Sequence, residues 1–352
     1  MGVIFRTVPL PLFLHIGSGT LKDLQTVLHE YHLSFDRPLI VSQPNIVEAL
    51  HLNLPQLFPQ GQVDFVSDNT FAEVDRIITL AQKKDNDVII SIGGGRVLDV
   101  GKQAGTILRL NYINVPTAPS NDAIASPTAV LKDTEGKSQS IGVNMPLGVL
   151  VDLEVMAKAP AHIIAGGIGD LMSNISALKD WKLGQVDKQE VIDDFAYLLS
   201  ETSVETLFAP YCNLQKITVT EPDFLRRLTQ GLVLSGISAS IAGTSRPFSG
   251  AEHEISHAID TLFPGTGMHG HQVGYATLLT EEIRGSDWKP LATFFKSVGV
   301  PTKYAAFKLT EDQMVKAIQY APQTRPDRYT ILEKLNLPAE KIRQVVRSVE
   351  QG

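Results

Sequence analysis

Short apolar runs alternate with amphipathic segments over roughly the first 150 residues of the chain. The runs PLIVS, VDFV and DVIISIGGG each precede a segment with helical periodicity, and these segments read NIVEALHL, TFAEVDRIITLAQKK and RVLDVGKQAGTIL. Strands that alternate with helices in this way predict a parallel sheet with crossover helices. The stretch at residues 128–143 predicts a hairpin with Gly136 in its turn, and GVLVD supplies a further strand.

Helical periodicity with few β-branched runs dominates the chain beyond about residue 155. We expect the helices of this part to break at Gly184, Pro210, Pro264 and Pro301. A chain of 352 residues exceeds the size at which a single core usually stops growing. We therefore predict an α/β domain with a Rossmann-like parallel sheet at residues 1–157 and an all-helical domain at residues 158–352.

The composition is that of an ordinary globular enzyme, with a net charge of −7 and no run of Lys or Arg. This balance argues against nucleic acid as the main partner, and no apolar stretch is long enough to span a membrane. The N-terminal apolar run is interrupted by Pro9 and Pro11, and we interpret it as a first strand rather than a signal peptide. The single cysteine, Cys212, excludes internal disulfides and a cysteine-built zinc site. We expect a cytoplasmic enzyme.

Three consecutive glycines, at residues 93–95, join the apolar run at residues 88–92 to a helical segment. Glycines at such a junction let the backbone approach a phosphate closely, and the N-terminus of the helix adds N–H donors. The pattern is neither G-x-G-x-x-G nor a Walker loop. It favours nucleotide or phosphate binding over the alternative, which is a tight turn that binds nothing.

A second unusual stretch is VPTAPSNDAIASP at residues 115–127, which follows a predicted strand and is crowded with small polar residues. Taken alone, it is an ordinary loop. Its composition also suits the lining of a phosphate or sugar pocket. Asp122 is the one carboxylate of this stretch and can anchor a hydroxyl group of a ligand.

Four of the nine histidines lie within residues 253–271, in the segments AEHEISHAID and GMHGHQVGY. His253 and His257 match the zinc-protease pattern H-E-x-x-H and share one face of a helix. Metals of the zinc or iron type prefer His and carboxylate ligands, and Asp170 and His269 are further candidates. Each residue also has an ordinary interpretation, as a helix cap or a surface histidine. Together they have the composition of a metal centre with an open coordination position.

These segments occur together in one known family. The stretches SIGGGRVLDVGK, VPTAPSNDAIASP, GIGDLMSNISALKDW, SRPFSGAEHEISHAID and HGHQVGYATLL resemble the sn-glycerol-1-phosphate dehydrogenase family in order and spacing. That family belongs to a larger group with the glycerol dehydrogenases, the iron-dependent alcohol dehydrogenases and the dehydroquinate synthases. The resemblance covers roughly residues 15–285 and implies a dehydroquinate synthase-like fold.

The resemblance also implies roles for individual residues. The dinucleotide would be held by residues of the glycine turn and of the second stretch, which are Gly94, Gly95, Arg96, Val97, Leu98, Thr117, Ala118, Pro119, Ser120 and Ser126. The metal ligands would be Asp170, His253 and His269. Asp122 and His257 would be catalytic and would bind the substrate together with Asp170. Under this interpretation the Glu of HEISH is not the base of a protease.

Two departures from related sequences bear on the cofactors. Iron-dependent relatives have a further histidine four residues after the metal-binding Asp, where this chain has Asn174. The loss of that ligand favours Zn²⁺, with iron or nickel as alternatives. NAD-selective relatives have an acidic residue where this chain has Gln43, so we expect NADP to be accepted as well as NAD.

We expect reversible hydride transfer from NAD(P)H to dihydroxyacetone phosphate, giving sn-glycerol 1-phosphate, with the metal polarising the carbonyl oxygen. Arg246 is expected to bind the substrate phosphate, because a guanidinium forks onto phosphate oxygens, and a structural salt bridge is the alternative. A dehydrogenase for glycerol or another polyol, a metalloprotease and a non-catalytic nucleotide-binding protein stay open as other functions. A homo-oligomer acting on a small molecule is expected.

Overall fold

The structure is a computed structural model that describes residues 7–214 and 216–352. The chain forms two compact units. The sheet unit comprises the chain up to Pro119 together with Ala123–Ala159, and the helical unit comprises Ser120–Asp122 together with Pro160–Gly352. The roles predicted for residues 1–157, in dinucleotide binding, and for residues 158–352, in binding metal and substrate, stay predictions.

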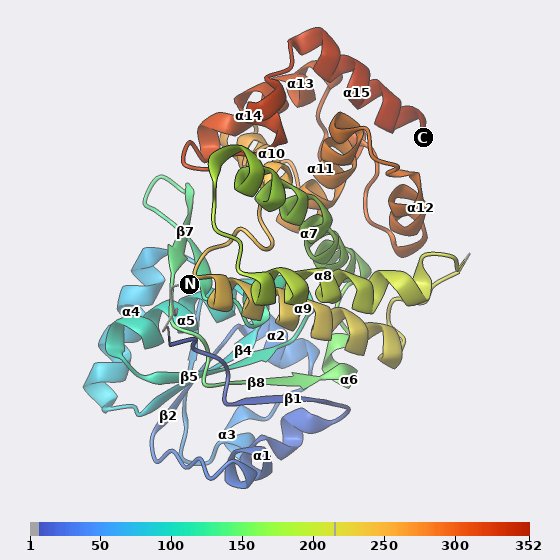
Figure 1. Cartoon of the computed structure of the whole chain (residues 1–352). Helices are drawn as coiled ribbons and strands as arrows, with labels where there is room; N and C mark the ends of the chain where they lie inside the picture. Colours follow the sequence, from blue (N-terminus) through green and yellow to red (C-terminus); the bar gives the residue numbers. More distant parts are fainter. Residues whose placement is uncertain (1–6, 215) are drawn as a thin grey trace. The chain divides into compact units, whose positions relative to one another are not determined.

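A parallel sheet forms the centre of the sheet unit (Figure 1). Among the described residues its six strands follow the order β1-β8-β5-β4-β2-β3, and every pairing is parallel. The strands are β1 (Phe13–Gly17), β2 (Pro38–Ser42), β3 (Gln62–Phe65), β4 (Val88–Gly93), β5 (Asn111–Pro116) and β8 (Gly148–Asp152). Strands β2, β4 and β8 are buried along their whole length, as expected where both faces of a parallel sheet are covered.

Helices cover both faces of this sheet. They are η1 (Thr20–Asp23), α1 (Leu24–Glu30), α2 (Pro44–Ala49), α3 (Leu54–Leu57), α4 (Phe71–Lys84), α5 (Gly95–Leu108) and α6 (Leu153–Met156), and the short η2 (Asp122–Ile124) joins the two units. One hydrophobic cluster joins Leu24 of α1 to Ile90 of β4, and another joins Ile77 of α4 and Val100 of α5 to Ile89. Adjacent residues of a strand point to opposite faces, so α1 packs on one face and α4 and α5 pack on the other. The predicted alternation of strands and helices is confirmed.

The predicted hairpin is also present. Strands β6 (Thr128–Lys132) and β7 (Ser138–Gly142) pair antiparallel. Gly136 lies in the connection with a φ of 80°, a left-handed conformation that a glycine adopts without steric cost.

The helical unit follows the sheet unit in the chain (Figure 1). Its longer helices are α7 (Ala161–Lys188), α8 (Asp194–Tyr211), α9 (Pro222–Ala242), α10 (Ala251–Leu262), α11 (His269–Arg284), α12 (Lys289–Val298), α13 (Glu311–Tyr320) and α15 (Ala339–Gln351). Its shorter ones are η3 (Tyr304–Phe307), η4 (Ala321–Thr324) and α14 (Ile331–Leu335). No helix within the described residues is both long enough and apolar enough to cross a membrane.

One predicted helix break is wrong. Gly184 lies inside α7, which continues to Lys188 before Gln189 adopts a left-handed φ of 57°. A Cβ at Gly184 would lie 2.6 Å from the Glu190 carboxyl group, so this glycine makes room for a side chain that folds back on the helix. The other predicted breaks fall next to helix ends, at Pro210, Pro264 and Pro301.

Candidate active site

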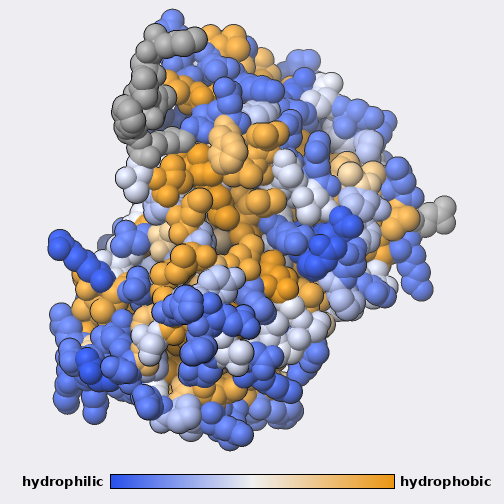
Figure 2. Space-filling view, turned by 60° about the horizontal axis from the view of Figure 1, so that its bottom comes forward, coloured by the Kyte–Doolittle hydropathy of each residue, from blue (hydrophilic) through white to orange (hydrophobic). Residues whose placement is uncertain are grey.

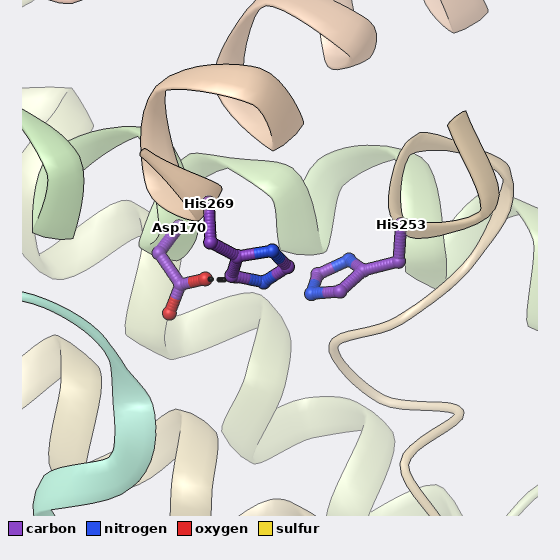
Figure 3. Close-up of side chains that lie close together, drawn as sticks. All are labelled: Asp170, His253 and His269. Atoms are coloured by element: carbon purple, nitrogen blue, oxygen red, sulfur yellow. Dashed lines mark ion pairs between the residues drawn. The ribbon is translucent and has the colours of Figure 1, made fainter. Parts of the chain in front are cut away.

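Three side chains from distant parts of the sequence gather in the helical unit (Figure 3). Asp170 lies in α7, His253 lies in α10, and His269 is the first residue of α11. One possible ligand atom of each lies within 4.8 Å of the other two, and His269 Nε2 is 3.7 Å from Asp170 Oδ1. Figure 3 shows the two imidazole rings pointing toward each other, with the carboxylate beside His269. The structure thus brings together the residues that the family resemblance implies as metal ligands.

Glycines allow α7 and α11 to touch at this point. A Cβ at Gly169 would lie 2.1 Å from the carbonyl oxygen of Gly270, and a Cβ at Gly270 would lie 2.0 Å from that of Gly166. No side chain fits in so little space, so the two helix backbones are in direct contact. Asp170 follows Gly169, and His269 precedes Gly270. The helix contact therefore places the carboxylate beside the imidazole.

Hydrogen bonds orient both histidines toward the cluster. His253 Nδ1 lies 2.9 Å from Glu252 Oε1, and a carboxylate accepts the Nδ1 proton. His269 Nδ1 lies 3.1 Å from Ser256 Oγ, and this hydroxyl donates its own proton to Gln272 Oε1 at 2.7 Å. Ser256 must therefore accept from His269. Both rings then carry their proton on Nδ1 and a lone pair on Nε2, the form that binds a metal through Nε2.

The electrostatics of the cluster fit a divalent cation. Burial raises the pKa of Asp170 to about 7, and the N–H of Asp122 opposes this shift while the charge of Glu252 adds to it. Burial lowers the pKa of both His253 and His269, which keeps the imidazoles neutral and able to offer lone pairs. A cation among these groups would restore the charged form of the Asp170 carboxylate. The donor set is one that zinc and iron centres use.

The two residues expected to be catalytic lie beside the cluster. The ring centroid of His257 is 6.3 Å from those of His253 and His269. Asp122 donates its backbone N–H to Asp170 Oδ2 at 3.0 Å, which holds its loop against the cluster. Both positions agree with contact to a substrate bound at the cluster, and both roles stay predictions.

Asp180 on α7 holds the start of α10 in place. Its Oδ2 accepts the N–H of Ala251, the first residue of α10, at 2.8 Å. Its Oδ1 accepts the N–H of Ile331 at 2.8 Å and pairs with Arg284 of α11 at 2.5 Å. Asp180 is fully buried, so these contacts satisfy a carboxylate that water does not reach. Helix α7 therefore carries Asp170 and also anchors the helices that carry the two histidines.

Asn174 occupies the position at which iron-dependent relatives have a further histidine. Its side-chain Nδ2 lies 3.0–3.1 Å from three serine hydroxyls on α8 and α9, those of Ser200, Ser203 and Ser235. Asn174 is fully buried and ties α7 to its neighbouring helices. The expected preference for zinc, which follows from this residue, stays a prediction.

Arg246, the residue expected to bind the substrate phosphate, forms an ion pair with Glu190. Its Nε donates to Glu190 Oε2 at 2.8 Å, and its Nη2 donates to Glu190 Oε1 and, at 2.9 Å, to the carbonyl of Tyr329. Its Nη1 has no hydrogen-bond partner among the described residues. The guanidinium is thus engaged in the salt bridge that was the alternative interpretation, and its phosphate role stays a prediction.

In the sheet unit, the residues expected to bind the dinucleotide lie at the carboxyl ends of neighbouring strands. Gly93 at the end of β4 and Pro116 at the end of β5 face each other in the sheet register. The N–H of Thr117 donates to Gly93 O at 3.0 Å, which joins the two loops that follow these strands. The sequence stretches 94–98 and 117–119 therefore meet at one end of the sheet. Parallel α/β sheets bind their ligands at such strand ends.

Gly93 and Gly94 differ in how much space surrounds them. A Cβ at Gly93 would lie 2.6 Å from the side chain of Val97, so the turn packs tightly against the helix there. A Cβ at Gly94 would meet nothing within 4 Å, and its φ of −76° suits any residue. Gly94 is the N-cap of α5, next to the N–H groups that lack partners at a helix start. The fold leaves open space at Gly94 that suits a phosphate.

Other members of the expected dinucleotide set have different surroundings. Val97 and Leu98 are buried, and their N–H groups donate to the carbonyl that caps α5, so they support the turn. The Arg96 side chain is largely exposed and takes part in a surface ion pair at 4.0 Å. Ser126 is buried, and its Oγ lies 3.5 Å from the carbonyl of Thr128, the first residue of β6. Ser120 belongs to the helical unit.

Three residues that complete the cluster were not identified from the sequence. Glu252 directly precedes His253, and a carboxylate next to a candidate ligand is a signal that a search could have used. Ser256 and Asp180 carry no such signal, because their partners lie 13 and 71 positions away along the chain.

Comparisons with known proteins decide the family. Residues 15–160 match the family model of iron-containing alcohol dehydrogenase. A glycerol-1-phosphate dehydrogenase of Cenarchaeum symbiosum is 38% identical over 97% of this chain and 96% of its own length. Another, from Nitrosopumilus maritimus, is 33% identical over 98% of this chain and 97% of its own length. The chain belongs to the glycerol-1-phosphate dehydrogenase family. The resemblance drawn from the sequence motifs is confirmed.

Solved structures related to this glycerol-1-phosphate dehydrogenase family member share its fold. A probable glycerol dehydrogenase from Sinorhizobium meliloti has a TM-score of 0.78 at 19% identity, with 98% of each chain covered. Glycerol dehydrogenase from Schizosaccharomyces pombe has a TM-score of 0.76 at 19% identity, covering 99% of this chain and 91% of that one. At such identities the likeness concerns the fold alone, and it confirms the predicted fold class.

Proposed function

We propose that this protein is a metal-dependent, NAD(P)-linked oxidoreductase that interconverts dihydroxyacetone phosphate and sn-glycerol 1-phosphate. Its membership in the glycerol-1-phosphate dehydrogenase family, at up to 38% identity over nearly the full chain, carries this conclusion. When bound, a divalent metal, for which we propose Zn²⁺, polarises the ketone oxygen, and NAD(P)H supplies the hydride.

The residues of the helical unit would hold the metal and position the ketone. Asp170, His253 and His269 would be the ligands, because their donor atoms converge and both imidazoles have Nε2 free of other hydrogen bonds among the described residues. Glu252 and Ser256 fix the two rings through Nδ1. An orientation that is set before binding reduces the entropy lost when metal and substrate bind.

His257 is suited to move the proton of the substrate oxygen. Burial lowers its pKa most, and interactions with His269, His253, Arg325 and Arg328 lower it further. A neutral His257 can accept the hydroxyl proton of glycerol 1-phosphate, and its protonated form returns that proton in the reductive direction. Asp122 is proposed to bind a substrate hydroxyl from the loop that is tied to Asp170.

The sheet unit would hold the dinucleotide. We assign its pyrophosphate to the open space at Gly94 and to the N–H groups at the start of α5. Gln43 directly follows β2, a neighbour of β4 in the sheet, and it brings no negative charge that would repel a 2′-phosphate. Both NAD and NADP are therefore proposed as cofactors.

A steady-state assay with dihydroxyacetone phosphate and either NADH or NADPH tests this function. We expect reduction with both cofactors, loss of activity with a chelator, recovery with Zn²⁺, and sn-glycerol 1-phosphate as the product in chiral analysis. Faster oxidation of free glycerol than of glycerol 1-phosphate would instead identify a polyol dehydrogenase.

A cytoplasmic location and a homo-oligomeric state are also proposed. Figure 2 shows hydrophobic residues among those exposed in the view that it draws. In the sheet unit, Leu10, Leu12 and Leu14 are exposed at or next to β1, which is an edge strand. Exposed apolar side chains along a sheet edge suit contact with another subunit. Light scattering coupled to size-exclusion chromatography measures the mass in solution, and a monomer would contradict the proposal.

A further inference from the structure

Two arginines of the helical unit lie in the segment that follows η4, a short helix packed against α10, which carries His253 and His257. Arg325 directly follows η4. The backbone N–H of Arg328 donates to the carbonyl oxygen of Arg325 at 2.9 Å. Helix η4 packs along α10, where Thr324 Oγ1 lies 3.4 Å from the carbonyl of Glu254, the neighbour of His253. The segment that carries both arginines is therefore held against the helix that carries His253 and His257.

Arg328 is a buried cation with neutral hydrogen-bond partners. Its Nη1 donates to the carbonyl of Ser249, and its Nη2 donates to Ser245 Oγ at 2.8 Å. The residue is 7% exposed, and no carboxylate pairs with it among the described residues. Burial and the charges of Arg325 and Arg246 lower its pKa to about 10, against the opposing effect of Glu254 and Glu252. A buried charge without a direct counter-ion is costly unless a ligand supplies one.

Arg325 is partly buried, and its guanidinium has no hydrogen bond or ion pair among the described residues. Its neighbour Thr324 contacts the Glu254 carbonyl on α10, so Arg325 extends from a backbone position beside the helix that carries His253 and His257.

Arg246 offers a weaker site for an anion. Its Nε and Nη2 already bind the Glu190 carboxylate, which neutralises the guanidinium. A phosphate at Arg246 would have to compete with this carboxylate and would meet its negative charge. Arg325 has no ion pair or side-chain hydrogen bond among the described residues, so a phosphate there would displace no carboxylate. Arg328 lies with Arg246, Glu190 and Asp327 around one pocket, and its guanidinium bonds to Ser249 and Ser245 rather than to either carboxylate.

We propose that Arg325 and Arg328 form the phosphate-binding site of the substrate, with Arg325 contacting the phosphate oxygens directly. Arg328 adds its charge from a position that Ser245 and Ser249 fix. A triose phosphate is short, so its phosphate must lie near the ketone and hence near the metal cluster. The guanidinium fork suits phosphate oxygens, and two such groups suit a dianion. This inference rests on the proposed function and names the residues that give it specificity for a phosphorylated substrate.

The test compares two substrates that differ in the phosphate. Arg325→Gln is assayed with dihydroxyacetone phosphate and with free dihydroxyacetone at saturating NADH, beside Arg246→Gln and the surface control Arg347→Gln. Loss of a charge-assisted contact predicts a fall of about 10- to 100-fold in kcat/KM for the phosphorylated ketone in Arg325→Gln. The value for dihydroxyacetone is expected to change less than twofold, and Arg325→Lys is expected to recover part of the loss.

The ratio of kcat/KM for the two substrates, compared between the variants, can also show that the phosphate binds elsewhere. If Arg325→Gln keeps the wild-type preference and Arg246→Gln loses it, the phosphate site lies at Arg246 and the proposal is overturned. An equal loss with both substrates in Arg325→Gln would also overturn it, because a phosphate contact cannot affect the free ketone.

A binding measurement separates this proposal from the proposed function. Inorganic phosphate is titrated against the wild-type protein and Arg325→Gln, with no substrate or cofactor, by calorimetry. Binding to the wild type that falls about tenfold or more in the variant supports the anion site even if dihydroxyacetone phosphate is not reduced. Equal binding by both proteins would refute the site. Failure of the wild type to reduce the ketone would count against the proposed function alone.

Discussion

The two candidate binding regions of this molecule are built in opposite ways. The glycine turn of the sheet unit consists of consecutive residues and offers backbone N–H groups beside the empty space at Gly94. The cluster of the helical unit consists of side chains from α7, α10 and α11, and each is fixed by a hydrogen bond to another group of that unit. Added atoms should therefore weaken cofactor binding at the glycine turn, and removed atoms should weaken metal binding at the cluster.

Removal of a ligand side chain should have the largest effect. His253→Ala and His269→Ala each delete one donor of the cluster, so we expect loss of stoichiometric Zn²⁺ and a fall in kcat on the order of 1,000-fold. Metal content by mass spectrometry and steady-state rates check this expectation. His271→Ala serves as the control, since His271 lies on the same helix but bonds to the carbonyl of His162. Full metal content in either ligand variant would show that the ligand set is wrong.

A smaller loss is expected when the orienting carboxylate is neutralised. Glu252→Gln weakens the acceptor for His253 Nδ1, and we expect metal affinity to fall about 10- to 100-fold in competition with a chelator.

Glu254→Gln is the matched control for that variant. Burial and the nearby charges of Glu333 and Asp180 raise the pKa of Glu254 to about 9, so its carboxyl group is already neutral at pH 7. Glutamine should replace it with unchanged metal affinity and activity. Loss of metal from Glu254→Gln but not from Glu252→Gln would mean that Glu254, and not Glu252, supports metal binding. Loss of catalysis from Glu254→Gln with full metal content would indicate that Glu254 acts as a base.

The smallest of these effects concerns the glycine turn. Gly94→Ala adds a methyl group that no protein atom opposes, so we expect an unchanged melting temperature and a KM for NADH about tenfold higher. Gly142→Ala is the control, because a Cβ there also meets nothing within 4 Å but lies on the hairpin strand β7. Equal KM values in the two variants would mean that the cofactor does not approach Gly94.

The sequence predicted local structure better than it predicted partners. Strands β2 and β8 lie where PLIVS and GVLVD predict them, because the hydrophobic run of a buried strand is itself a local signal. Gly184 was misjudged because the group that needs its space, Glu190, folds back on the helix. The same carboxylate engages Arg246 across 56 positions of sequence, which no periodicity reveals.

The cluster was predictable only in part, and for a related reason. Asp170 and His269 are visible as residue types, but their approach depends on the contact of glycine backbones across α7 and α11. The resemblance to a known family indicated that Asp170, His253 and His269 act together, which the residue types alone did not decide. Arg325 was missed because its side chain, which has no partner among the described residues, leaves no trace in local sequence patterns.

Because Asp180 anchors the start of α10, the spacing along α7 between Asp170 and Asp180 helps to set the distance between Asp170 and His253. Asp170 and Asp180 are separated by about 15 Å of helix at 1.5 Å per residue, and this length sets where α10 begins relative to the metal ligand on α7. One inserted residue between them would turn Asp180 by about 100° around the helix axis. Descendants of this chain can therefore vary at many surface positions of α7, but an insertion or deletion in that interval would uncouple His253 from Asp170.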